Sequence, residues 1–205
     1  MTPRATPMRP EERRLAIVEA VIPLILESGT MPTTREIAEA AGVAEGTIYR
    51  VFDDKHALLW AVAEHVLAPP RAGEELGASL TDLPDLPSKI RVVVERMQRS
   101  IQRVSAILMV VRQQATPEHL AHAEKRGGPP EFVVRANADL LTRLTAVFEL
   151  HRDELRVEPA AAALTLRSLV FGSQHPGMTG DAPLTADQIA DIVTHGVCRK
   201  DSPCC

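Results

Sequence analysis

Residues 33–59, TTREIAEAAGVAEGTIYRVFDDKHALL, decide the fold of this chain. Thr33 and Glu36 have the T-x-x-E spacing of a capping box, in which each side chain satisfies a free backbone amide at a helix start. Gly42 follows that helix at a point where a left-handed backbone is needed, which glycine adopts without steric cost. A second short helix is expected over residues 44–52. The stretch therefore predicts a helix-turn-helix, whose second helix is shaped to enter the major groove of DNA.

The residues around this motif resemble the N-terminal domain of TetR-family transcriptional regulators. The sequence IVEAVIPLILESG at 17–29 corresponds to the first helix, and TTREIAEAAGV at 33–43 to the second helix and turn. The sequence GTIYRVFDDK at 46–55 corresponds to the recognition helix and the entry to a fourth helix. The resemblance covers about residues 11–60. It implies a three-helix DNA-binding domain, followed by a helical domain that binds an effector and dimerises.

The rest of the chain predicts an all-α fold, because apolar residues recur at helical spacing and no segment alternates as a strand does. Proline-rich breaks separate the expected helices. These helices cover residues 55–68, 88–104, 106–115, 131–151, 160–172 and 185–198. We predict a helix-turn-helix domain at 1–54, an effector-binding and dimerisation domain at 55–200, and a flexible tail at 201–205.

The net charge of −4 means that DNA binding cannot be inferred from bulk basicity. Residues 1–60 are themselves slightly acidic, so attraction to phosphate must come from a few well-placed cations. The chain is 45% hydrophobic, but no apolar run approaches the roughly 18 residues that cross a membrane. The N-terminal sequence MTPRATPMRP does not have the pattern of a signal peptide. We therefore expect a cytoplasmic protein with no membrane partner.

The candidate DNA contacts are polar and cationic residues of the motif and its flanks. Thr47 and Arg50 are predicted to read bases, because arginine donates two hydrogen bonds to guanine and the threonine methyl contacts the thymine methyl. Lys55 resembles the family lysine that contacts the DNA backbone. The full predicted set is Thr34, Arg35, Glu45, Thr47, Tyr49, Arg50 and Lys55. Upstream, Arg4, Arg9, Arg13 and Arg14 form either an arm that reaches DNA or a solvated tail.

Glu45 departs from the commoner pattern of the family, which often has a lysine at this point. Its negative charge has two interpretations. Either the carboxylate accepts a hydrogen bond from a cytosine amino group, or it complements the positive N-terminal end of its own helix. The second interpretation is favoured at this point.

The last two helices are the predicted dimer interface. A helix-turn-helix that reads an inverted repeat needs two copies about one DNA turn apart, roughly 34 Å. Two helices from each subunit form a four-helix bundle in this prediction. The alternative is that the same faces pack within one chain. The predicted interface residues are Ala160, Ala163, Leu164, Arg167, Phe171, Ile189, Ile192 and Val193.

The resemblance also implies a small-molecule pocket in the second domain. Each apolar candidate is more typical of ordinary core than of a pocket, and the polar candidates are more typical of exposed surface. The predicted effector-binding residues are Met97, Ile101, Leu108, Met109, Gln113, Phe132, Asn137, Phe148 and His175.

No phosphate-binding loop, nucleophile elbow or metalloprotease motif occurs, so we predict neither an enzyme nor a cofactor. Cys198, Cys204 and Cys205 are either a soft-metal or oxidant-sensing group or a reduced tail, and the reduced tail is favoured. The predicted function is a homodimeric repressor, released from an inverted-repeat operator by a small-molecule effector. The alternative is a DNA-binding dimer without such an effector, controlled by a protein partner or acting as an activator.

Overall fold

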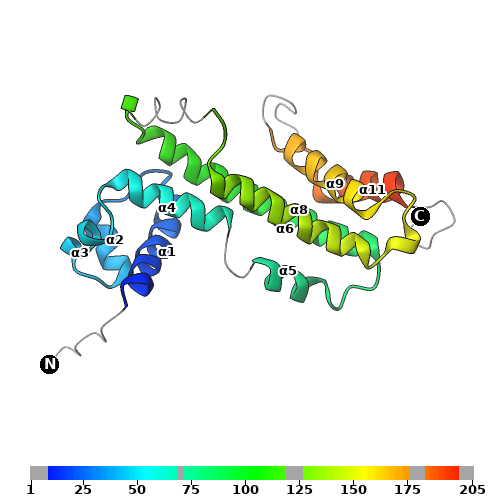
Figure 1. The fold of residues 1–205 in the computed structure, drawn as a ribbon, viewed down its shortest axis with the longest axis horizontal. Coiled ribbons are helices and arrows are strands. Elements are labelled where there is room, and N and C mark those ends of the chain that lie inside the picture. The colour runs from blue at the N-terminus through cyan, green and yellow to red at the C-terminus, as the bar shows by residue number, and fades with distance from the viewer. Residues whose placement is uncertain (1–8, 69–71, 119–126, 176–182, 199–205) are drawn as a thin grey trace. The chain divides into compact units, whose positions relative to one another are not determined.

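A computed structural model describes residues 9–68, 72–118, 127–175 and 183–198. These residues form nine α-helices and one 3-10 helix (Figure 1). The α-helices are α1 (Pro10–Ser28), α2 (Thr34–Ala41), α3 (Glu45–Val51), α4 (Lys55–Leu67), α5 (Ala72–Leu80), α6 (Leu86–Gln113), α8 (Glu131–Glu149), α9 (Pro159–Ser173) and α11 (Ala186–Val197), and η1 is Arg152–Glu154. In these ranges the only extended pairing is a single antiparallel bridge between Leu155 and Cys198. The all-α prediction is confirmed.

The chain divides into two compact units. Unit 1 comprises residues 1–67 and 103–129, and unit 2 comprises residues 68–102 and 130–205. Helix α4 belongs to unit 1, because it buries Leu58, Leu59 and Val62 in the same core as the first three helices. Across the described ranges, no helix has the length and apolar composition needed to cross a membrane.

The core of unit 1 holds the first four helices together. Helix α1 packs against α2, α3 and α4. Its buried residues recur three or four positions apart, so they line one face of the helix. The buried aliphatic side chains of this face are Ile17, Val18, Val21, Ile22 and Ile25. The second half of α6 adds Ile107, Val110 and Val111 to the same cluster.

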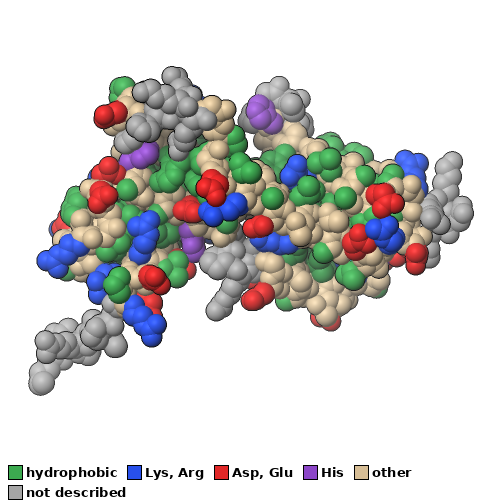
Figure 2. All heavy atoms as spheres, in the orientation of Figure 1, with side chains coloured by type: hydrophobic (Ala, Val, Ile, Leu, Met, Phe, Trp, Pro, Cys, Tyr) green, Lys and Arg blue, Asp and Glu red, His purple; other side chains and the backbone are tan. Residues whose placement is uncertain are grey.

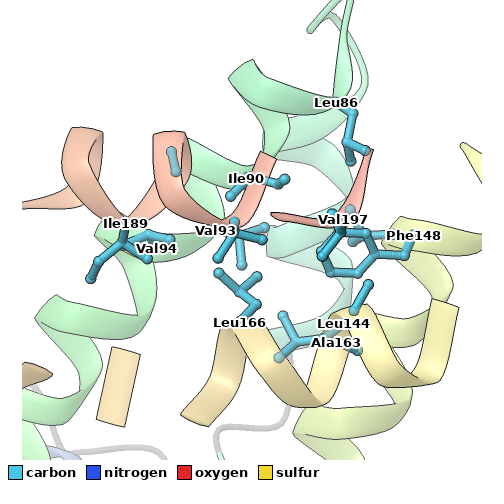
Figure 3. Close-up of a cluster of buried hydrophobic side chains, with 14 of the residues drawn as sticks. Leu86, Ile90, Val93, Val94, Leu144, Phe148, Ala163, Leu166, Ile189 and Val197 are labelled. Carbon is cyan, nitrogen blue, oxygen red and sulfur yellow. The ribbon is translucent and has the colours of Figure 1, made fainter. Parts of the chain in front are cut away.

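The core of unit 2 is formed by side chains from α6, α8, α9 and α11, which meet in one cluster (Figure 3). Phe148 of α8 is fully buried there and is the largest of these side chains. Ala163 and Leu166 of α9 lie in the same cluster, with Ile189 of α11. The small alanine allows α8 and α9 to approach closely.

The helix expected at 88–104 and its apolar continuation at 106–115 form one helix, α6, since no glycine or proline interrupts residues 88–115 and Pro87 is tolerated in a first turn. One local prediction is wrong. Cys198 is disulfide-bonded and buried, so the expected reduced thiol at this position is incorrect. Cys204 and Cys205 lie outside the described residues.

Candidate nucleic-acid interface

Helix α2 begins with the predicted capping box. The Glu36 backbone N–H donates to Thr33 Oγ1 at 3.2 Å, and the Thr33 backbone N–H donates to Glu36 Oε2 at 2.7 Å. The Thr33 hydroxyl also donates to this carboxylate, at 2.8 Å. These hydrogen bonds favour the ionised form and lower the pKa of Glu36. The side chains of Thr33 and Glu36 therefore determine where α2 begins.

The turn between α2 and α3 depends on Gly42, whose φ of 65° lies in the left-handed region. The Gly42 N–H donates to the carbonyls of Ala38 and Glu39, and the Val43 N–H donates to the Ala38 carbonyl at 2.9 Å. These bonds satisfy carbonyls at the end of α2 and redirect the chain into α3. Any side chain at residue 42 would strain this turn.

Buried residues anchor both short helices to unit 1. Ile37 of α2 and Ile48 of α3 lie in the core, as does Phe52 directly after α3. Phe52 has extended backbone, so α3 ends one residue earlier than the predicted helix. On the outward face of α3, Tyr49 is 57% exposed and Arg50 is also exposed. Thr47 is half-buried and therefore less accessible than these two. This is the geometry of a helix-turn-helix with a free recognition face.

Three cations of this surface have no acidic partner within the described part of the chain: Arg35, Arg50 and Lys55. All three are exposed, and Lys and Arg side chains are visible on the α1–α3 part of the molecule in Figure 2. Lys55 is the first residue of α4, after Asp54, whose Oδ1 accepts the Ala57 N–H at 2.6 Å. A cation at a helix N-terminus does not help the helix dipole, so helix stability does not explain Lys55.

Arg13 and Arg14 do not belong to the arm that the sequence suggested as one alternative. Helix α1 begins at Pro10, so Arg13 and Arg14 are helical residues. The Arg14 guanidinium lies 4.4 Å from the centroid of the Phe52 ring, as a cation–π contact. The backbone N–H of Arg9 donates to Glu12 at 3.0 Å. Arg4 lies outside the described residues.

A contact that the sequence did not predict joins the two short helices. The Thr34 hydroxyl donates to Glu45 Oε1 at 2.7 Å. The two residues are the first of α2 and of α3, and they are 11 positions apart. Glu45 lies in the first turn of α3, where its charge can complement the positive helix end, and its carboxylate also accepts a hydrogen bond from the neighbouring helix. No local pattern signals this pair, because only the turn brings the two residues together.

The predicted interface residues of α9 and α11 divide into two groups. Ala163, Ile189 and Val193 are buried in the core of unit 2, so they are not available to a partner. Ala160 is exposed and Arg167 is half-buried, with Arg167 donating to the Asn137 carbonyl at 3.4 Å. The exposed apolar members are Leu164, Phe171 and Ile192, at 46%, 44% and 50% exposure.

The predicted effector residues do not come together as one set. Leu108, Met109 and Gln113 belong to unit 1 and are exposed. The other six belong to unit 2, where Met97, Phe132 and Phe148 are buried, Ile101 is half-buried, and Asn137 and His175 are exposed. Phe148 is part of the central core, which explains its burial without a ligand.

The family model described as bacterial regulatory proteins, tetR family, matches residues 17–62, from α1 into α4. Residues 17–62 are therefore a DNA-binding domain of the TetR family. As a TetR-family protein the chain is a DNA-binding transcriptional regulator and not an enzyme. The matched segment contains the capping box, the Gly42 turn and α3, which are the features that define the surface described above.

Solved structures of TetR-family proteins have the same fold. A putative TetR-family transcriptional regulator from Mesorhizobium loti is 17% identical, with 94% of this chain and 100% of that chain covered and a TM-score of 0.63. SmeT, the repressor of the Stenotrophomonas maltophilia multidrug efflux pump SmeDEF, is 21% identical over 92% and 91% of the two chains, with a TM-score of 0.56. SmeT in complex with triclosan is 20% identical over 92% and 93%, with a TM-score of 0.53. At these identities the likeness concerns the fold alone.

Proposed function

We propose that this TetR-family regulator is a homodimeric repressor that occupies an inverted-repeat operator in the cytoplasm and leaves it when a small molecule binds unit 2. The observation that carries the proposal is the exposed surface of the helix-turn-helix, where Arg35, Arg50 and Lys55 have no acidic partner in the described ranges. Exposed cations without an acidic partner, on a protein of net negative charge, are the groups that the phosphate backbone of DNA attracts.

Two helices of unit 2 support the dimer. On α9, Leu164 and Phe171 are seven positions apart and therefore lie on one face, opposite the buried residues of that helix. Ile192 is exposed on α11, which packs against α9. Hydrophobic side chains are exposed on this part of unit 2 in Figure 2. Exposed apolar side chains on two helices that pack against each other fit the self-complementary contact of a two-fold dimer.

The effector part of the proposal is supported by SmeT, which is a repressor of similar fold and has been solved with triclosan. In this chain, Met97, Ile101 and Phe132 are apolar residues of unit 2, and we retain them as the proposed effector contacts. A ligand there acts only if it binds the conformation that fits DNA poorly more tightly than the conformation that fits DNA well.

Selection of binding sites from random duplex DNA, at near-physiological salt, tests the main claim. We expect enrichment of an inverted repeat with half-sites about one helical turn apart. Salt-sensitive binding without any sequence preference would contradict an operator-binding repressor.

Arg50→Ala is expected to weaken operator binding by about 1–3 kcal/mol, because an arginine that donates two hydrogen bonds to guanine is lost. The affinity should fall only for duplexes that carry the guanine contacted by Arg50 in each half-site. Binding to the selected operator and to its single-position variants measures this effect. Equal weakening on every duplex would assign Arg50 to phosphate instead.

Lys55→Ala is expected to weaken binding to every sequence alike, because a phosphate contact carries no base information. The plot of log affinity against log salt concentration should become shallower by about one unit per subunit. Glu64→Ala, at an exposed position of the same helix, is the matched control. An unchanged salt slope in the lysine variant would remove Lys55 from the contact set.

Release of the labelled operator by small molecules tests the effector. Triclosan is the first probe, followed by a panel of aliphatic and mixed apolar compounds. A compound that releases the wild type but not the Met97→Ala variant from the operator would support effector binding next to Met97 of α6. Failure of the whole panel favours control by a protein partner.

A further inference from the structure

The hydrogen bond between Thr34 and Glu45 joins the starts of the two helices that a helix-turn-helix presents to DNA. Thr34 is half-buried and Glu45 is exposed. The Thr34 hydroxyl has one hydrogen, and that hydrogen goes to Glu45 Oε1 at 2.7 Å. The hydroxyl therefore cannot also donate to a phosphate while this bond exists.

The bond fixes the Glu45 side chain without using up its hydrogen-bonding capacity. A free glutamate side chain has many rotamers, and ordering it costs conformational entropy. Because the bond to Thr34 orders the Glu45 side chain before DNA binds, less entropy is lost on binding. The second oxygen, Oε2, has no hydrogen-bond partner among the described residues. Among the described residues the Glu45 carboxylate has no hydrogen bond to the amides at the start of its own helix, because its one bond is to Thr34.

The position of this carboxylate restricts what it can face on DNA. In a helix-turn-helix, the N-terminal residues of the second helix approach base edges in the major groove. An ionised carboxylate only accepts hydrogen bonds, so it is repelled by phosphate and by the acceptors of guanine and thymine. Adenine presents a donor beside the N7 acceptor, whereas cytosine presents its N4 amino group as a donor alone.

From this geometry we infer that Glu45 is a specificity-determining residue that accepts a hydrogen bond from a cytosine amino group, and that Thr34 is the positioning residue that holds it. The inference rests on the proposed operator binding and specifies one base of each half-site, the cytosine that Glu45 contacts. It also gives Thr34 a role within the protein in place of the predicted direct contact with DNA.

Site selection with the full-length chain and four variants tests the inference. The wild type should select cytosine at one position of each half-site, by about tenfold or more over the other bases. Glu45→Ala should lose that preference alone and keep the preference that depends on Arg50. Glu45→Gln should shift the preference toward adenine, because a glutamine amide can both accept from N6 and donate to N7.

The threonine variants separate positioning from folding. Thr34→Val removes the hydroxyl at nearly constant volume and should weaken the cytosine preference severalfold, whereas Thr34→Ser keeps the donor and should retain it. Thermal unfolding of each variant checks that the domain is intact.

Each outcome bears on a different claim. A wild type without any selected repeat overturns the proposed function together with this inference. A selected repeat that is the same in the wild type and in Glu45→Ala overturns the inference alone and returns Glu45 to a helix-stabilising role. Full cytosine preference in Thr34→Val overturns the positioning role of Thr34.

Discussion

Leu164→Asp is expected to convert the protein from dimer to monomer and to lower its affinity for the full operator by a factor on the order of 10³. Leu164 lies on the exposed apolar face of α9, with Phe171 one heptad away and Ile192 on α11. In the proposed dimer this face is buried against its own copy. A two-fold contact contains the substituted residue twice, so two like-charged carboxylates would lose their hydration in the interface, and this costs more free energy than the dimer contact supplies.

The loss of operator affinity follows from the loss of the dimer. A monomer contacts one half-site, and the second half-site then no longer benefits from a high effective concentration. The contacts of Arg50 and Lys55 within one half-site remain as they were. The variant should therefore bind a single half-site with nearly unchanged affinity while it loses the advantage of the full repeat.

Two measurements check this result. Sedimentation or light scattering gives the molar mass in solution, which should fall to that of one chain, 22.3 kDa. Anisotropy titration with full-site and half-site duplexes gives the two affinities. Val134→Asp is the matched control, because Val134 is an apolar residue of α8 with 53% exposure and lies outside the proposed interface. A Leu164→Asp protein that remains dimeric would move the interface away from α9.

The helix-turn-helix was predictable because its signals are local. The capping box of Thr33 and Glu36 needs only a three-residue spacing, and the turn at Gly42 needs only one residue without a Cβ. Both are present in the structure as expected. The exposure of Arg35, Arg50 and Lys55 was predictable for the same reason, since the helix bounds fix which residues point outward.

The interface of α9 and α11 was only half predictable, because burial depends on what lies opposite. Ala163 and Leu164 are neighbours in sequence and both are apolar, yet the first is buried and the second is exposed. Helix α9 is apolar on more than one face, so its pattern does not distinguish a partner within the chain from a partner subunit. The same ambiguity placed Phe148, a core residue, among the effector contacts.

Contacts between distant residues were not predictable from the sequence at all. The sequence around His151 gives no sign of its hydrogen-bond partners. One of them, Lys89, is 62 positions away. Lys89 Nζ donates to His151 Nε2 at 3.0 Å, because an ammonium has no acceptor. The other ring nitrogen, Nδ1, then donates to Glu154 at 2.6 Å. This chain of bonds ties α6 to η1, and only the fold of unit 2 creates it.

Phe148→Ala is expected to lower the free energy of unfolding of unit 2 by about 3–5 kcal/mol. The ring is fully buried between α6, α8, α9 and α11, and its loss removes apolar contacts and leaves a cavity that close-packed neighbours fill only in part. Leu150→Ala is the matched control two residues away. Leu150 is 77% exposed, so its truncation should change the unfolding free energy by less than about 0.5 kcal/mol.

Urea unfolding with two probes turns this substitution into a test of how the two units are coupled. Trp60 is the only tryptophan and lies in α4 of unit 1, whereas far-ultraviolet circular dichroism reports the helices of both units. If the units unfold independently, Phe148→Ala moves part of the dichroism transition to lower urea and leaves the Trp60 fluorescence transition in place. If both probes move together, the units unfold as one, and an effector bound in unit 2 can act on the DNA-binding helices through stability as well as through shape. A loss below about 1 kcal/mol would contradict the central position of Phe148 in the core.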